Sequence, residues 1–382
     1  MPIHKRESHR VPSHLSELSR RPSAPPRDLV LVSAGLDLDG GGRALAGRLL
    51  AGACAELARS RGVGFRVLTL DGQLPPGVTA EARSFGGRQK ALALRVWRDQ
   101  VRDSGRTAYV FDLLGPSRVQ AYLPSRLRAP YLIPLYGIEV WRPLSWDRAR
   151  ALANATVRLA ISTHTLERAR PFCPGLDGTA VLPLALEERP PAGEVDGSLL
   201  ERAGEGFLLI VGRMASTERY KGHDQLLEAM PRLPGARLVI AGEGDDRPRL
   251  EEKARALGIA SRVVFTGFVS EATLAGMYGR CAVFAMPSRG EGFGLVYLEA
   301  MRAGKPCVAA RASAAEEVVA DGGTGLLVDP DDPGELTGAL ERLLENPDVA
   351  RKMGEAGRRR WRSEFSVERF WSRLEPLLGR LV

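Results

Sequence analysis

Short apolar runs alternate with amphipathic stretches of helical spacing along most of the chain after residue 28. In the first half the apolar runs are DLVLVSAG (28–35), YLIPLY (131–136) and VRLAISTH (157–164). Between the first two, apolar residues recur on one helical stripe, formed by Leu45, Leu49, Leu50, Ala53 and Leu57. Runs that are apolar throughout are typical of parallel strands buried on both faces, so the pattern predicts a strand–helix alternation.

The alternation stops at residues 186–205, which are rich in Pro, Gly and Glu, and then restarts. The expected strands of the second half are 207–212, 236–242, 262–267, 281–288, 305–310 and 325–329. Asp332 followed by Pro333 predicts a helix start, because a capping carboxylate precedes Pro at the first helical position. The last segment, 365–382, repeats apolar residues every three and four positions and predicts a final amphipathic helix.

Length supports two domains, because 382 residues exceed the usual size of one. Strands that alternate with helices predict a doubly wound parallel sheet in each half. We expect the last helix to pack back across the linker on the first domain. The predicted units are a disordered tail (1–27), an N-terminal Rossmann-like domain (28–190), a linker (191–205), a C-terminal Rossmann-like domain (206–364) and the final helix (365–382).

Composition excludes several classes of protein. Hydrophobic residues make up 44% and charged residues 26%, which is ordinary for a globular protein. The sequence has no apolar run of the roughly 18 residues that a membrane span needs, and its first 28 residues lack the apolar core of a secretion signal. The four cysteines are widely spaced, which argues against a zinc site and, without a secretion signal, favours the reducing cytoplasm.

Positive charge is concentrated in the first half. Residues 1–190 carry a formal net charge of +11, whereas residues 191–382 carry −3. A basic half suits nucleic acid, an anionic membrane surface or an acidic substrate, but scattered arginines on a solvated surface would give the same count. One basic amphipathic stretch, residues 88–102 with Leu92, Val96 and Trp97, could lie on an anionic membrane; the alternative is a helix packed on the first sheet.

The first candidate site is the stretch SRGEGFGLVYLEAMRAGKP (288–306), where a strand, a Gly-rich turn and a helix follow one another. The free amides of Phe293, Gly294 and Leu295 at the helix start would bind an anion or a ligand hydroxyl. Glu291 in the turn and Glu299 on the second helical turn could face one pocket and accept hydrogen bonds from paired sugar hydroxyls. The alternative is a capped helix with two surface glutamates.

Two further clusters also follow strands. After strand 207–212 come Gly212 and Arg213, and then Lys221 opens a helix, so two cations would lie beside a helix N-terminus as in a phosphate site. In LDLDGGGRAL (36–45), Gly41 and Gly42 end a loop and would let backbone approach a phosphate or substrate. Open α/β sheets bind ligands at the carboxyl ends of their strands, so the three clusters predict a cleft between the domains.

Together these residues resemble the retaining glycosyltransferases of family 4, which have the GT-B fold. The resemblance covers nearly all of residues 206–345. It rests on E291-G-F-G-L-V-Y-L-E299 as the E-x(7)-E motif, Ala303-Gly304-Lys305-Pro306, G212-R213 with K221-G222, AGEGDDRPRLE (241–251), FTGFVS (265–270) and DGGTGLLVDPDDP (321–333). In the first domain it is weaker and rests on the Gly-rich loop, GIEVWRP (137–143) and a strand ending at Ser162.

The resemblance implies a role for each matching residue. Arg213 and Lys221 would bind the diphosphate of a nucleotide-sugar donor, with Gly212 beside them. Glu291 and the amides of Phe293, Gly294 and Leu295 would hold the donor sugar and phosphate, and Glu299 would bind the ribose. Phe268 and Val269 would contact the base, while Gly41 and Gly42 would approach from the acceptor side.

The chain departs from the family pattern at two places. Tyr136 stands where a His often lies near the donor sugar, and a phenol can donate a hydrogen bond but cannot shuttle protons near neutral pH. Ser313-Ala314 replaces a Gly pair beside the sugar phosphate. Because no Asp-x-Asp follows the phosphate cluster, we expect no metal and no other cofactor.

The predicted activity is transfer of a sugar, with retention, from a UDP- or GDP-linked donor to a hydroxyl of a glycan, lipid-linked or small-molecule acceptor, as in bacterial polysaccharide or glycoconjugate synthesis. A glycoside hydrolase or phosphorylase could also use paired glutamates. Glycoside hydrolysis, however, needs neither the anion-binding helix start nor the neighbouring cations. We expect no nucleic-acid partner, since no nucleic-acid-binding motif is found. The expected location is the cytoplasm, peripheral to the membrane if 88–102 binds it.

Overall fold

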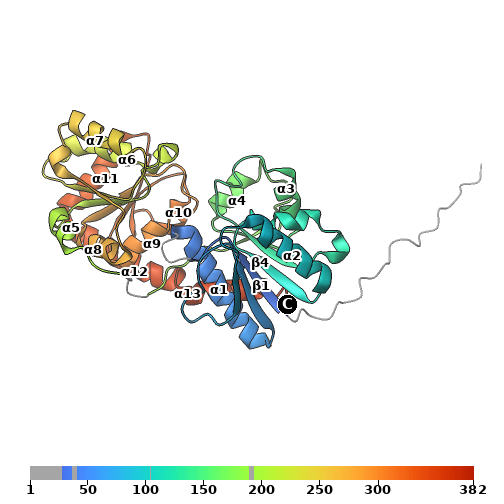
Figure 1. Ribbon diagram of the computed structural model, residues 1–382. Helices are drawn as coiled ribbons and strands as arrows, with labels where there is room; N and C mark the ends of the chain where they lie inside the picture. The colour runs from blue at the N-terminus through green and yellow to red at the C-terminus, as the bar shows by residue number, and fades with distance from the viewer. Residues whose placement is uncertain (1–27, 37–40, 104, 189–192) are drawn as a thin grey trace, which may run out of the picture.

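The computed structural model describes residues 28–36, 41–103, 105–188 and 193–382, and it folds into two α/β units, each built on one sheet (Figure 1). The predicted tail and part of the predicted linker therefore lie outside the described residues. Within the described ranges no helix is both long and apolar enough to cross a bilayer.

The first sheet has seven parallel strands in the order β3-β2-β1-β4-β5-β6-β7. Its strands are β1 Asp28–Ser33, β2 Gly64–Thr69, β3 Glu81–Ser84, β4 Thr107–Phe111, β5 Tyr131–Leu135, β6 Val157–Ala160 and β7 Ala180–Val181. Its helices are α1 Gly41–Arg61, α2 Gln89–Asp103, α3 Trp146–Ala153 and α4 Thr163–Ala169, with 3₁₀ segments η2 Pro116–Tyr122 and η3 Ser125–Leu127. The order reverses between β1 and β4, which makes that point the place where a ligand would bind.

The second sheet has six parallel strands in the order β10-β9-β8-β11-β12-β13. Its strands are β8 Leu208–Val211, β9 Leu238–Ala241, β10 Val263–Gly267, β11 Val283–Met286, β12 Cys307–Ala310 and β13 Gly325–Val328. The helices are α5 Gly197–Ala203, α6 His223–Ala229, α7 Arg247–Ala256, α8 Glu271–Arg280, α9 Leu295–Arg302, α10 Ala315–Val318, α11 Pro333–Glu345 and α12 Pro347–Glu364; the 3₁₀ segments are η4 Ser216–Lys221, η5 Met230–Arg232 and η6 Ala260–Arg262. The order reverses between β8 and β11.

The doubly wound sheet predicted for each half is confirmed, and every strand predicted from an apolar run is present. Four strands of the first sheet were not predicted. β3 (EARS) is an exposed edge strand and β7 has only two residues, so neither leaves an apolar run. Arg66 interrupts the apolar pattern of β2, whereas β4 (TAYVF) is a buried apolar run that the prediction left out.

Both faces of the first sheet are buried, as its central strand shows. Leu29 and Leu31 of β1 belong to the cluster that includes α1, whereas Val30 and Val32 belong to a second cluster with Leu92 of α2. Because side chains of a strand alternate between faces, α1 and α2 cover opposite faces of this sheet.

The helix α13, Val367–Leu378, ends the chain and packs on α1 of the first unit (Figure 1). Phe370, Leu374 and Leu378 are buried, and the ring of Trp371 lies against Gly52, where a Cβ would come within 2.9 Å of it. The cluster that includes the second sheet also contains α1 and α13, so one apolar core continues between the two units. Asp332 caps α11 through the amides of Gly334 and Glu335, as predicted.

The helix α2 resolves the two alternatives for residues 88–102 in part. Leu92 and Val96 are buried, so this side packs on the domain and cannot reach a membrane. Trp97, at 41% exposed, lies on the outward side together with Leu94 and Val101.

Two glycines in neighbouring helices give a matched test of packing. Gly354 of α12 lies so close to α9 and its following turn that a Cβ would come within 2.0 Å of the Gly304 carbonyl oxygen, whereas a Cβ on Gly338 of α11 meets nothing within 4 Å. Alanine gains about 1 kcal/mol of helix propensity at both sites. We therefore expect Gly354→Ala to lower the free energy of unfolding by more than about 2 kcal/mol, since a backbone carbonyl must move. Gly338→Ala should leave it unchanged or raise it, and urea unfolding of both variants measures the difference; equal effects would contradict this packing.

Candidate functional site

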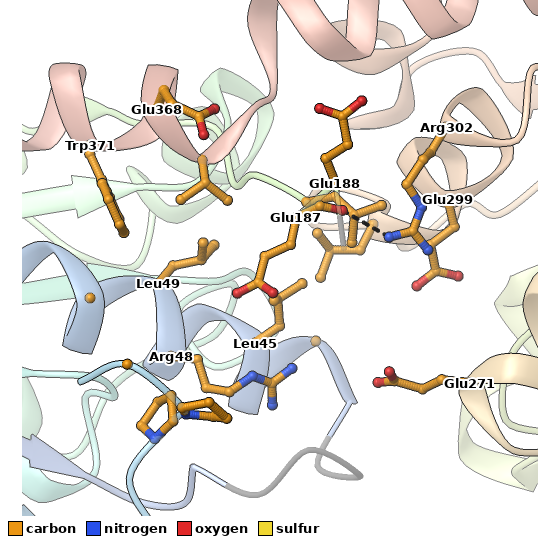
Figure 2. Close-up of a pocket in the computed structure, with 18 of the residues that line it drawn as sticks. Leu45, Arg48, Leu49, Glu187, Glu188, Glu271, Glu299, Arg302, Glu368 and Trp371 are labelled. Atoms are coloured by element: carbon orange, nitrogen blue, oxygen red, sulfur yellow. Dashed lines mark hydrogen bonds between the residues drawn. The ribbon is translucent and has the colours of Figure 1, made fainter. Parts of the chain in front are cut away.

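A cavity of about 690 Å³ is lined by residues of both units, among them Val211 at the carboxyl end of β8. One wall is α1 with the loop around Pro75, the opposite wall is formed by α8 and α9, and α13 closes one end. Figure 2 shows Leu45 and Arg48 of α1 on one side and Glu299 and Glu271 on the other. Side chains far apart in sequence therefore line one space between the domains, where the sequence predicts the site.

The turn between β11 and α9 ends at Gly294, which adopts φ 93° and is the N-cap of α9. A Cβ at Gly294 would come within 2.3 Å of the Tyr297 ring, so glycine is required for both conformation and space. Phe293 is buried and packs edge-on against Phe365, and Leu295, the first residue of α9, lines the cavity. The helix therefore begins with its amide end at the domain boundary, as expected.

The two glutamates of this segment lie in different surroundings. Glu299 lines the cavity, whereas Glu291 does not. Burial raises the pKa of Glu291, while the Lys221 charge and the amides of Phe293 and Gly292 lower it. The structure thus places Glu291 near Lys221 and not on the cavity wall that carries Glu299. Glu291 lies in the loop before α9 and Glu299 lies within α9, and the left-handed Gly294 separates the two.

Glu299 has a buried partner that sequence reasoning missed. The hydroxyl of Tyr278 donates a hydrogen bond of 2.8 Å to Glu299 Oε2, and Tyr278 is 2% exposed. Burial raises the pKa of Glu299, and the Tyr278 hydrogen bond opposes that rise. Tyr278 comes from α8, so no local motif could have linked it to Glu299; its hydroxyl fixes one carboxylate oxygen of Glu299.

Arg213 and Lys221 converge, although seven residues separate them. Lys221 Nζ lies 2.9 Å from Glu218 Oε2, and Arg213 binds the other oxygen of the same carboxylate. The Lys221 stem runs along Gly212, where a Cβ would come within 3.2 Å of it. Two cations therefore meet beside the end of β8, as the phosphate prediction requires, but Glu218 between them was not foreseen.

Gly42, near the start of α1, lies close to the first residue of α9. Residues 37–40 lie outside the described residues, and Gly41 is the first residue of α1. A Cβ on Gly42 would come within 3.0 Å of Leu295 Cδ1, so this end of α1 closely faces the start of α9. A larger residue at position 42 would narrow the gap between the domains at this point.

Tyr136 and Gly137 follow β5 and contact the turn that contains Gly292. A Cβ on Gly292 would lie 2.3 Å from the Tyr136 carbonyl oxygen, so only glycine fits there. The Ser162 and Thr165 hydroxyls donate to the Gly292 carbonyl at 2.7 and 3.1 Å. This contact joins the first unit directly to the Glu291 loop.

A second polar contact between the units involves Glu317. Its carboxylate accepts hydrogen bonds from the amides of Thr163 and His164 at 2.9 and 2.8 Å, at the start of α4. Ser313 and Ala314, at the expected Gly pair, are both buried, and the Ser313 hydroxyl donates to the Ala310 carbonyl oxygen at 2.9 Å. These residues shape the turn that presents Glu317.

Phe268 and Val269, predicted to contact a base, follow β10. Phe268 is 67% exposed and Val269 is half-buried, and neither lines the cavity. The structure therefore brings neither of them to the cavity wall, while Glu271, two residues after Val269, does line it.

Asp112 is a second residue that sequence reasoning missed. It follows β4 at the reversal point of the first sheet, is 2% exposed, and accepts hydrogen bonds from the Ser33 hydroxyl at 2.6 Å and the Ala34 amide at 2.9 Å. Burial raises its pKa to about 7 in spite of these bonds. A carboxylate directly after the buried strand TAYVF was the signal that could have revealed it. It holds the start of the loop that leads to Gly41.

Among the described residues, no three His, Cys, Asp or Glu side chains gather as a metal ion would require. All four cysteines are buried and free.

The chain is similar to proteins of known class. A family model described as glycosyl transferases group 1 matches residues 194–360. A GDP-mannose-dependent alpha-(1-6)-phosphatidylinositol monomannoside mannosyltransferase of Mycobacterium tuberculosis is 31% identical over 77% of this chain and 92% of that protein. The protein of that name from Mycolicibacterium smegmatis is 37% identical over 56% of this chain, and the match spans 60% of its length.

Solved structures share the architecture. Sucrose-phosphate synthase from Thermosynechococcus elongatus superposes with a TM-score of 0.72 at 22% identity, over 93% of this chain and 99% of that one. HepE of Anabaena, solved with UDP and glucose, gives a TM-score of 0.70 at 19% identity over 92% and 99%. The predicted GT-B fold is confirmed.

The buried Asp112 carboxyl should make stability depend on pH. Its pKa lies near 7 in the folded protein and near 3.8 unfolded, so between these values the folded state holds the proton more tightly. Stability contributed by protonated Asp112 is therefore present at acid pH and is lost as pH rises through about 4 to 7. We expect Asp112→Asn to gain about 1–4 kcal/mol of unfolding free energy relative to the native chain over this interval.

Urea unfolding at pH 4.5, 6 and 7.5 measures the difference. Asp71→Asn, an exposed carboxylate in the same unit, should follow the native chain at every pH. A constant difference between Asp112→Asn and the native chain would contradict this account of the carboxyl.

Proposed function

The chain belongs to the group 1 glycosyl transferases, and on that premise we propose that it moves a sugar from a nucleoside diphosphate sugar to an acceptor hydroxyl with retention of anomeric configuration. The observation that carries the proposal is the convergence of Arg213 and Lys221 on one anionic group beside the end of β8. A diphosphate is the ligand class that such a pair suits, because each cation can neutralise charge that develops on the leaving group.

The neighbouring residues extend this assignment. Glu299, whose carboxylate is hydrogen-bonded by Tyr278, would accept hydrogen bonds from the ribose. Phe268 and Val269 would contact the base through their backbone atoms. Glu291 and the amides at the start of α9 would hold the donor sugar and its phosphate. Gly42 would border the acceptor and Tyr136 the donor sugar, since both lie on the first unit close to the turn and start of α9.

The reaction exchanges one bond of the sugar. The bond from the anomeric carbon to the diphosphate oxygen breaks, and a bond to the acceptor oxygen forms on the same face. The acceptor proton passes to the departing phosphate oxygen, so no protein base is needed. Arg213 and Lys221 stabilise the charge that the leaving group acquires, and the closed contact at Gly292 positions the reactants. We propose that these two cations do the work of a metal ion.

The relatives suggest a donor and an acceptor class. Two of them are named as GDP-mannose-dependent enzymes that act on a phosphatidylinositol mannoside, and one aligns over 92% of its length. We therefore propose GDP-mannose as the first donor to test and a lipid-linked polyol as acceptor. A cytoplasmic enzyme that acts on such an acceptor has to approach the inner membrane surface.

The outward side of α2 supports that approach. Leu94, Trp97 and Val101 are 55%, 41% and 37% exposed and recur at helical spacing. Three exposed cations border them: Lys90, Arg98 and Arg102. An apolar stripe edged by cations is typical of a helix that lies in the headgroup region of an anionic bilayer.

Nucleotide binding tests the donor site. Thermal stabilisation should be measured with GDP, UDP, ADP, CDP and dTDP, each with EDTA and with magnesium, because a ligand of the native state raises the midpoint. We expect GDP to give the largest shift and EDTA to leave it intact. Arg213→Ala and Lys221→Ala should each weaken binding about tenfold or more, since each loses a charge-assisted bond.

Arg255→Ala is the matched control, because Arg255 lies on α7 outside this loop and pairs with Glu252 at 2.6 Å. It should bind GDP like the native chain. No shift with any nucleotide would refute the transferase proposal and direct attention to hydrolysis.

Vesicle co-sedimentation tests the α2 surface. The native chain should bind phosphatidylglycerol-containing vesicles at low salt and not phosphatidylcholine vesicles, because the attraction is to anionic headgroups. Replacing Lys90, Arg98 and Arg102 by Gln, or Trp97 by Ala, should reduce the bound fraction severalfold. Gln at the exposed Arg351, Arg358 and Arg359 of α12 removes equal charge elsewhere and should change little. Equal losses in both triple variants would show that net charge alone drives binding.

A further inference from the structure

The two cations of the proposed diphosphate clamp are already neutralised by a carboxylate of the chain. Glu218 Oε2 lies 2.9 Å from Lys221 Nζ, and Oε1 binds the Arg213 guanidinium. The Glu218 side chain is 14% exposed and Lys221 is 17% exposed, whereas Arg213 is 72% exposed. One carboxylate therefore bridges both cations and shields the inner one from solvent.

The rest of the loop is anchored elsewhere, so the Glu218 side chain is what occupies the clamp. The Ser216 hydroxyl and amide bind Asp245 at 2.6 and 2.9 Å, and Arg219 binds Asp246. The Tyr220 carbonyl accepts a hydrogen bond from the Arg289 amide at 3.0 Å. Glu218 itself departs from helical geometry within η4, with φ −122° and ψ 27°, and this break directs its side chain inward.

We propose that Glu218 is a built-in competitor of the donor diphosphate, which holds Arg213 and Lys221 in the free protein and leaves them when a nucleoside diphosphate binds. The inference rests on the proposed function, because it assigns the same clamp. A carboxylate and a pair of phosphate oxygens would pair with the same two cations in the same place, so both cannot be bound at once. The backbone of the loop can stay in place, since its other contacts do not involve the clamp.

Two consequences follow for binding. The carboxylate keeps both cations at the spacing of a bridging anion, so the clamp is formed before the ligand arrives. It also sets a threshold: an anion has to attract the pair more strongly than one carboxylate does. Either kind of ligand has to displace the same carboxylate, so Glu218 lowers the affinity for a monophosphate and for a diphosphate by the same factor.

The test is titration calorimetry of Glu218→Gln with GDP, GMP and inorganic pyrophosphate. Glutamine keeps the shape and removes the charge, so we expect GDP and pyrophosphate to bind about tenfold more tightly and GMP to gain by no more than the same factor. Glu218→Asp, too short to bridge both cations, should show a smaller gain. The gain should disappear in the Arg213→Ala, Lys221→Ala background.

Glu251→Gln is the matched control, since Glu251 pairs with Arg247 at 2.7 Å on a helix outside the clamp, and it should bind like the native chain. If Glu218→Gln binds GDP equally or more weakly while the native chain binds it, the carboxylate supports the cations and the competitor role is wrong. If neither protein binds GDP but pyrophosphate binds more tightly to the variant, the competitor role stands and the nucleotide assignment fails. If neither ligand binds either protein, both proposals fail.

Discussion

The contact at Gly292 is the constraint on which the site depends. The two units meet at the turn between β11 and α9, and residues of both units line the cavity. Gly292 allows the meeting, because a Cβ there would lie 2.3 Å from the Tyr136 carbonyl oxygen. Its own carbonyl then accepts hydrogen bonds from Ser162 and Thr165 of the first unit. The turn that carries Glu291 is thereby fixed from both sides.

Charged side chains of the second unit lie around the turn that contains Gly292. Burial raises the pKa values of both Glu291 and Glu299, so removal from water works against their ionised forms. Lys221 opposes this for Glu291, and a Tyr278 hydrogen bond opposes it for Glu299. Lys221 is in turn shared with Glu218. An arriving diphosphate would enter a network in which each charged group already has a partner.

Sequence periodicity was sufficient for the fold and for the neighbourhood of the site. Apolar runs located the buried strands, and the order of Gly212, Arg213, Lys221, Glu291 and Glu299 placed the chemistry at strand ends. Of the four strands that were not predicted, β3 and β7 are exposed or very short and carry no apolar signal. The residues that were not predicted contact partners that are distant in sequence. Tyr278 binds Glu299 from another helix, and Asp112 binds Ser33 of the neighbouring strand. Spacing along a chain does not encode such pairings. For α2 the alternative of a helix packed on the first sheet is confirmed on the side of Leu92 and Val96, whereas spacing overestimated how closely Glu291 and Glu299 share a wall of the cavity.

The most direct test of the central claim is a crystal structure of the chain with GDP. The account predicts the diphosphate between Arg213 and Lys221, the ribose on Glu299, and the Gly292 contact intact. A nucleotide bound away from these cations, or a diphosphate that leaves both of them on Glu218, would contradict it.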